Sequence, residues 1–116
     1  MKKAIICLVV IVTGIIAAAC DPYHRVPDAP VIKLTRDSQG IILSWDPVEG
    51  AMEYYVYSRY AMAGETTADT ASLKMLGITD FPSGARISPD YFIRFFAVRA
   101  GNRAGISGFS NVVRSE

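Results

Sequence analysis

The feature that most constrains the fold is the regular alternation of short strand-like runs with turn residues after residue 30. Runs of β-branched and aromatic residues are typical of strands, and Gly, Pro, Asp and Asn are typical of turns. The strand-like runs cover residues 31–35, 41–45, 54–60, 73–81, 91–100 and 110–114. The Ala- and Thr-rich segment 61–72 fits a loop, an edge strand or a short helix. About seven short strands without a sustained helical period predict an all-β sandwich.

The first 19 residues have the pattern of a cleavable export signal. Lys2 and Lys3 precede an apolar run that begins at Ala4, and small residues follow it as far as Ala19. This run is shorter than the roughly 20 residues that a membrane-spanning helix usually needs. We therefore expect residues 1–19 to be a signal helix that is removed.

The end of this signal resembles the bacterial lipobox, in which small or aliphatic residues precede an invariant cysteine. The matching residues are Ala17, Ala18, Ala19 and Cys20. The resemblance implies that Cys20 receives a diacylglycerol and that acyl chains such as palmitate anchor the protein in a membrane of the cell envelope. The alternatives are a chance cysteine after an ordinary signal and an uncleaved anchor. The sequence does not decide between the inner and the outer membrane.

The lipidated Cys20 begins a proline-rich stretch, residues 20–29, which we expect to be an extended tether between the membrane and the domain. Pro22 and Pro27 lie in this stretch, and Pro30 follows it. His24, the only histidine of the chain, also lies here. A single histidine in a tether is expected to be solvent-exposed rather than a ligand or a base.

Charge and cysteine content exclude two further classes of protein. Without Lys2 and Lys3 the remaining chain is close to neutral, so it has no electrostatic field that would attract nucleic acid. Cys7 lies in the signal, so after cleavage Cys20 is the one remaining cysteine and no internal disulfide can form. The domain must therefore be stabilised by its core.

Several short patterns resemble the fibronectin type III family in order and spacing. They are Ile41-x-Leu43-x-Trp45-Asp46-Pro47, Tyr54-x-Val56, the run Tyr91-Phe92-Ile93-Arg94-Phe95-Phe96-Ala97-Val98, and the series Asn102, Gly105, Ser107 and Ser110. The resemblance implies that residues 30–116 form a seven-stranded immunoglobulin-like sandwich. It also implies that Trp45 is a core residue and that Tyr91 occupies the tyrosine corner.

Strand alternation then sorts the residues between the two faces of a sheet. By analogy with the family, the core-facing set is Trp45, Tyr54, Val56, Tyr91, Ile93, Phe95 and Ala97. The opposite set would form an aromatic outer face made of Tyr55, Tyr57, Arg59, Phe92, Arg94 and Phe96, with Val98 beside them. Tyr and Arg are enriched in binding hot spots, so this face is a candidate protein-binding surface. The alternative is that segment 61–72 folds over it.

The sequence carries none of the common motifs of catalysis or cofactor binding. The chain has no phosphate-binding glycine loop, no paired Cys or His spacing for a metal and no calcium-loop motif, so we expect neither an enzyme nor a bound cofactor or metal. The predicted function is that of a membrane-anchored lipoprotein acting as a non-catalytic protein-binding module of the envelope, with an unidentified protein partner. The alternatives are an assembly subunit of an envelope complex and a carbohydrate-binding module.

Overall fold

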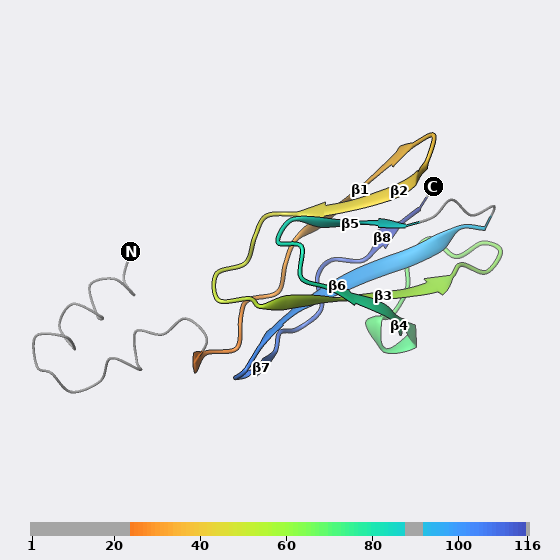
Figure 1. The fold of residues 1–116 in the computed structure, drawn as a ribbon. Helices are drawn as coiled ribbons and strands as arrows, with labels where there is room; N and C mark the ends of the chain where they lie inside the picture. The colour runs from red at the N-terminus through yellow and green to blue at the C-terminus, as the bar shows by residue number, and fades with distance from the viewer. Residues whose placement is uncertain (1–23, 88–91, 116) are drawn as a thin grey trace, which may run out of the picture.

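The computed structural model describes residues 24–87 and 92–115, and these residues form two antiparallel sheets packed face to face (Figure 1). The first sheet has the order β1 (Ile32–Asp37), β2 (Gly40–Trp45), β5 (Gly84–Ile87). The second has the order β4 (Lys74–Thr79), β3 (Glu53–Tyr60), β6 (Arg94–Asn102), β7 (Gly105–Ile106), and β8 (Val113–Arg114) also pairs with β6. The predicted all-β sandwich is confirmed. The signal helix, Cys20 and Tyr91 lie outside the described residues.

The described residues contain eight strands, so the prediction of seven was wrong. The difference arises at the end of the chain, where one continuous last strand was expected over residues 110–114. Instead, β7 and β8 are short strands on either side of an irregular stretch, 107–112. Segment 61–72 is a loop that ends in the 3₁₀ turn η3 (Thr70–Ser72).

The main core lies between the two sheets and is built from alternate residues of β2 and β3. Trp45, Tyr54 and Val56 are buried there, as predicted, because their neighbours in sequence point to the other face of each sheet. The rings of Trp45 and Tyr54 pack at 5.0 Å between centroids. The whole cluster is Ile32, Ile41, Leu43, Trp45, Tyr54, Val56, Phe96, Val98 and Ala100.

Strand β6 has the opposite orientation to the one predicted. Phe96 and Val98 face the main core, whereas Phe95 and Ala97 face away from it and belong to a second cluster. The prediction failed because all four residues are apolar and buried, so β6 is covered on both faces and its sequence does not mark which face is the inner one.

Three buried serines bind the edge of β6 where a regular partner strand is missing. In each pair the serine N–H donates to a β6 carbonyl at 2.7–2.8 Å, and the serine Oγ accepts the N–H of the same β6 residue at 2.8 Å. The pairs are Ser107 with Ala100, Ser110 with Val98, and Ser115 with Arg94. Side-chain hydroxyls thus satisfy buried backbone donors that would otherwise be unpaired. The chain between Ser107 and Ser110 is thus able to leave the plane of the sheet before β8 pairs with β6 again.

Candidate functional site

The predicted aromatic face divides into three parts in the structure. Residues of β3 and β6 that pair across the sheet share a face, and Tyr57 pairs with Ala97 while Arg59 pairs with Phe95. Phe96 is fully buried in the main core, so its assignment to the outer face was wrong. Tyr55, Tyr57 and Arg59 lie on the outer face of the sheet. Phe92 and Arg94 lie beside Tyr60, at the end of β3.

The outer face around Tyr57 is covered by the protein's own chain. Leu73 packs on Phe95 and Ala97 to form a second, smaller core, with Phe109 and Tyr57 against it. The rings of Tyr57 and Phe109 meet edge to face at 4.9 Å between centroids. Other residues that cover this cluster are Ala61, Ala68 and Val112. The loop 61–72 therefore folds over this face, which was the alternative interpretation, and the irregular stretch 107–112 does so too.

Arg59 holds the covering loop on the sheet. Its guanidinium makes two hydrogen bonds of 2.7 Å to the carboxylate of Glu65, and its Nε donates to Ser72 Oγ at 2.8 Å. It also lies over the ring of Phe95, 5.1 Å from the centroid. The paired guanidinium lowers the pKa of Glu65 to about 2. Arg59 is thus committed to internal contacts rather than to a partner.

Tyr55, which lies near the other end of β3 from Arg59, also makes internal contacts. Its hydroxyl donates to Glu53 Oε1 at 2.8 Å, and this bond to a carboxylate raises the pKa of the tyrosine. The ring lies so close to Gly101 that a Cβ built there would be 2.6 Å from Tyr55 Cε2. Tyr55 therefore packs on bare backbone of β6.

Phe92 and Arg94 both contact Tyr60 rather than the predicted neighbours Tyr55 and Tyr57. The guanidinium of Arg94 lies 4.1 Å from the centroid of the Tyr60 ring, and its Nη2 donates to the Tyr60 hydroxyl at 2.6 Å. The Phe92 ring meets Tyr60 edge to face at 5.5 Å. Phe92 and Tyr60 are more than half exposed. Because Arg94 covers one face of the Tyr60 ring, the cluster does not present a flat two-ring platform.

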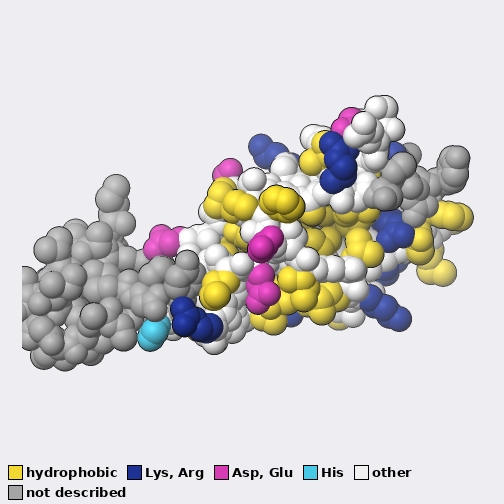
Figure 2. Space-filling model, in the orientation of Figure 1, with side chains coloured by type: hydrophobic (Ala, Val, Ile, Leu, Met, Phe, Trp, Pro, Cys, Tyr) yellow, Lys and Arg dark blue, Asp and Glu magenta, His cyan; other side chains and the backbone are white. Residues whose placement is uncertain are grey.

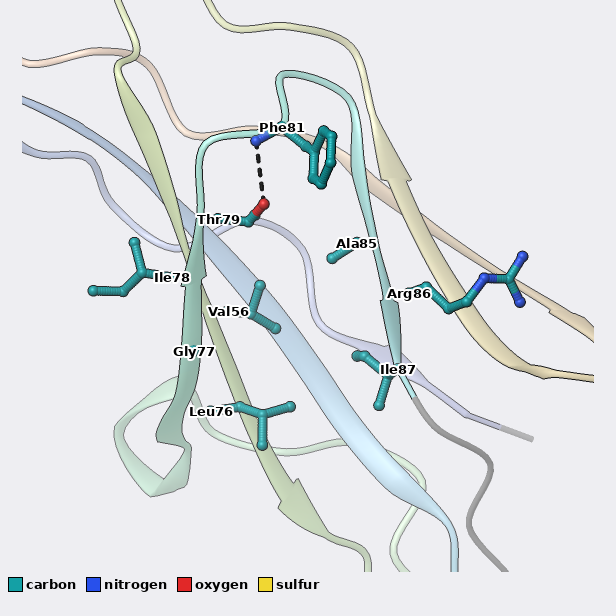
Figure 3. A pocket seen from close by; sticks show the side chains of 9 residues that line it. All are labelled: Val56, Leu76, Gly77, Ile78, Thr79, Phe81, Ala85, Arg86 and Ile87. Atoms are coloured by element: carbon teal, nitrogen blue, oxygen red, sulfur yellow. Dashed lines mark hydrogen bonds between the residues drawn. The ribbon is translucent and has the colours of Figure 1, made fainter.

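An apolar opening that was not predicted lies between the edges of the two sheets. A groove of about 390 Å³ separates β4 of the second sheet from β5 of the first. Figure 3 shows the side chains of Val56, Ala85 and Ile87 between these strands, with Phe81 on the connection between them; Ile78 and Arg86 point away. Apolar side chains dominate the described surface around it (Figure 2).

Two features of β4 keep this groove open. Gly77 pairs with Val56, so any side chain at position 77 would face the groove. A Cβ built on Gly77 meets no atom within 4 Å. The pairing of β4 with β3 also shifts register at Val56 and Tyr57, as in a β-bulge. We call the opening the β4–β5 groove. Leu76 and Phe81 on its rim are about half and two-thirds exposed (48% and 68%).

Arg86, the charged residue of the groove lining, is paired with Asp37. Arg86 Nη1 lies 2.9 Å from Asp37 Oδ1, and this contact lowers the pKa of Asp37 and raises that of Arg86. Both side chains are substantially exposed, so the pair adds little stability. The described part of the chain contains no group of three or more His, Cys, Asp or Glu residues arranged to hold a metal, and none of its helices has the length and hydrophobicity to cross a membrane.

Comparison with solved structures identifies the fold. The domain called FN3tt matches over 78% of this chain and 94% of its own, with 26% identity and a TM-score of 0.55, and a mutant of it matches with a TM-score of 0.58 at 23% identity. The described domain has a fibronectin type III fold. The fibronectin type III domain of human fibronectin type III domain containing protein 3 matches at 19% identity and a TM-score of 0.54, over 78% of this chain and 84% of its own.

The resemblance noted in the sequence therefore holds at the level of fold. No family model and no curated protein sequence matches the chain. Fold alone does not assign a function, so the function must be argued from the surfaces described above.

Proposed function

We propose that this protein is a lipid-anchored, non-catalytic module of the cell envelope that binds an extended apolar segment of another envelope protein in the β4–β5 groove. The observation that carries the proposal is the groove itself. It lies between two strands, each of which has a partner on only one side among the described residues. Exposed apolar residues, Leu76 and Phe81 among them, form its rim.

The geometry of the groove favours a partner in extended conformation. A strand edge offers unpaired N–H and C=O groups, and an added peptide strand gains backbone hydrogen bonds while its alternate side chains enter a pocket. The space left by Gly77 would receive one such side chain. The register shift in β4 disfavours long regular pairing between identical edges, which supports a short partner segment over open-ended self-association.

The anchoring part of the proposal rests on Cys20 and the signal before it. We expect the mature protein to incorporate a clickable palmitate analogue and to fractionate with membranes. Cys20→Ala should remove both properties together. A Cys20→Ala variant that is still processed, still labelled and still membrane-bound would contradict lipid anchoring at this residue.

The binding part is tested with a photocrosslinking amino acid in place of Phe81 in the native lipoprotein. We expect one discrete protein adduct in intact cells. Gly77→Leu should abolish it, because the new side chain would occupy the groove, while its Cβ meets no atom within 4 Å and so needs no shift of the backbone. The matched control is Gly108→Leu, where an added Cβ also meets nothing and the site is exposed and outside the groove lining.

The outcomes separate the candidate functions. An adduct that survives Gly77→Leu, or no adduct while the protein is present and lipidated, would contradict binding in the β4–β5 groove. An adduct with a second copy of the chain would instead favour the assembly-subunit alternative.

A further inference from the structure

The described part of the predicted tether is bound to the domain instead of extending from it. The side-chain amide of Asn102 donates to the carbonyl of Arg25 at 2.6 Å and to that of Gly50 at 3.0 Å. This one side chain therefore connects the N-terminal segment, the β2–β3 turn and the end of β6. Pro27 and Pro30 are buried along the same segment.

Val26 adds a packing contact to these hydrogen bonds. It lies against the β6–β7 hairpin, where a Cβ built on Gly105 would be 3.1 Å from Val26 Cγ2. Gly105 also has a φ of 148°, in the region that favours glycine, so the hairpin keeps a bare position under the segment. The domain thus begins near Arg25 rather than at Pro30.

We propose that this end of the sandwich lies against the lipid headgroups of the membrane that holds Cys20. The inference rests on the lipid anchor proposed above. Only Asp21, Pro22, Tyr23 and His24 separate Cys20 from Arg25. An extended chain advances about 3.3–3.6 Å per residue, so Cys20 and Arg25 are at most roughly 18 Å apart. A tether that was free as far as Pro30 would reach about twice that distance.

The chemistry of this end suits the surface of a bilayer. Val26, Met52 and Ile106 are apolar side chains left about half exposed, and Arg25 and Arg103 are exposed cationic side chains of the same region, which also exposes the acidic Asp28 and Glu49. Apolar groups beside arginines are the composition of surfaces that lie in the headgroup layer.

These side chains adjoin one another in the fold. The N–H of Met52 donates to the carbonyl of Gly101 at 2.8 Å, and Ile106 pairs with the same Gly101 across the hairpin. Figure 1 shows the N-terminal segment, the β2–β3 connection and the β7 hairpin at one end of the sandwich, with the β1–β2 turn at the other.

The test uses the full lipoprotein with single added cysteines. Cys7 and Cys20 are the only cysteines of the sequence, so the processed and lipidated protein has no free thiol. Met52→Cys and Ile106→Cys place a fluorescent label at the proposed contact. Ser38→Cys, in the exposed β1–β2 turn, is the matched control at the far end. Each labelled protein is reconstituted into phosphatidylcholine vesicles that contain a nickel-chelating headgroup lipid as quencher.

We expect strong quenching at positions 52 and 106 and little at position 38. Insertion of a long Gly-Ser linker between Tyr23 and His24 should remove the difference between the two ends. Equal quenching at both ends of vesicle-bound protein would overturn the proposed orientation and leave the lipid anchor standing. Protein that does not float with the vesicles at all would instead contradict the anchor.

Discussion

Replacing Ser110 with alanine removes the acceptor of a buried backbone donor. The N–H of Val98 donates to Ser110 Oγ at 2.8 Å, Val98 is fully buried and Ser110 nearly so. The same hydroxyl donates to the carbonyl of Asn111 at 2.9 Å. A buried donor left without a partner costs about 1–3 kcal/mol, so we expect Ser110→Ala to lower the free energy of unfolding by about 2 kcal/mol.

The assay is urea denaturation of residues 20–116 with Cys20 replaced by serine, followed by thermal unfolding. For a domain of this size, 2 kcal/mol corresponds to a melting temperature lower by roughly 8–16 °C. Amide hydrogen exchange gives a local readout, because the Val98 amide should lose protection more than the amides of β2. The pairing of Ser110 N–H with the Val98 carbonyl survives the substitution, so the strand edge itself should remain in place.

Ser58 supplies a matched control with the opposite expectation. It is as buried as Ser110, but its hydroxyl has no hydrogen-bond partner in the part of the chain that the structure describes. Ser58→Ala should therefore leave stability within about 0.5 kcal/mol of the parent or raise it, because an unpaired polar atom leaves the core. If both alanine variants lose the same stability, the role assigned to the serine hydroxyls is refuted.

Three further predictions follow from the contacts of other residues. Phe96→Ala should cost about 3–5 kcal/mol in the main core, whereas Phe92→Ala should cost less than about 1 kcal/mol, and equal losses in urea denaturation would contradict the observed orientation of β6. Glu65 has a pKa lowered to about 2 by Arg59, so its contribution to stability is present above its ordinary pKa of 4.5 and is lost as the pH falls toward 2. Glu65→Gln should accordingly be less stable than the parent at pH 6 and equal to it near pH 2, and a gap that stays constant across this range would argue against the pair. Asn102→Ala should lower the free energy of unfolding by about 1–2 kcal/mol and expose the peptide bond after Arg25 to proteolysis; unchanged protease resistance would contradict the bound tether.

The main core could be predicted because its strands carry a clear alternation. Trp45, Tyr54 and Val56 alternate with more polar or more exposed neighbours, so the strand period sorts the residues between two faces, and the resemblance to the fibronectin type III family marked which face is the inner one. The same logic failed on β6, where Phe95 and Phe96 are equally suited to a core. Only the pairing with β3 and the covering chain decide between them, and neither is a local property of the sequence.

The candidate binding surface of the structure differs from the predicted aromatic face for a related reason. The aromatic face was predicted on the assumption that the outer side of the sheet meets water, but Phe109 and Leu73 cover it. The β4–β5 groove was missed because the run 73–81 predicted only strand structure and did not indicate which of its apolar side chains stay exposed. Gly77 was the available signal, since a glycine inside a strand often marks a bulge or an unfilled position.

The serine-bound segment has a consequence for the order in which the domain can fold. Residues 107–115 follow all the longer strands in the sequence, yet they complete the edge of β6, and Phe109 and Val112 close the second core. A nascent chain that ends before Ser107 would leave most of the β6 edge unpaired and the second core without Phe109 and Val112. Stable folding must therefore wait for these late residues. For a protein that we propose is exported as an unfolded chain, this dependence keeps the polypeptide competent for translocation until residues 107–115 have been synthesised.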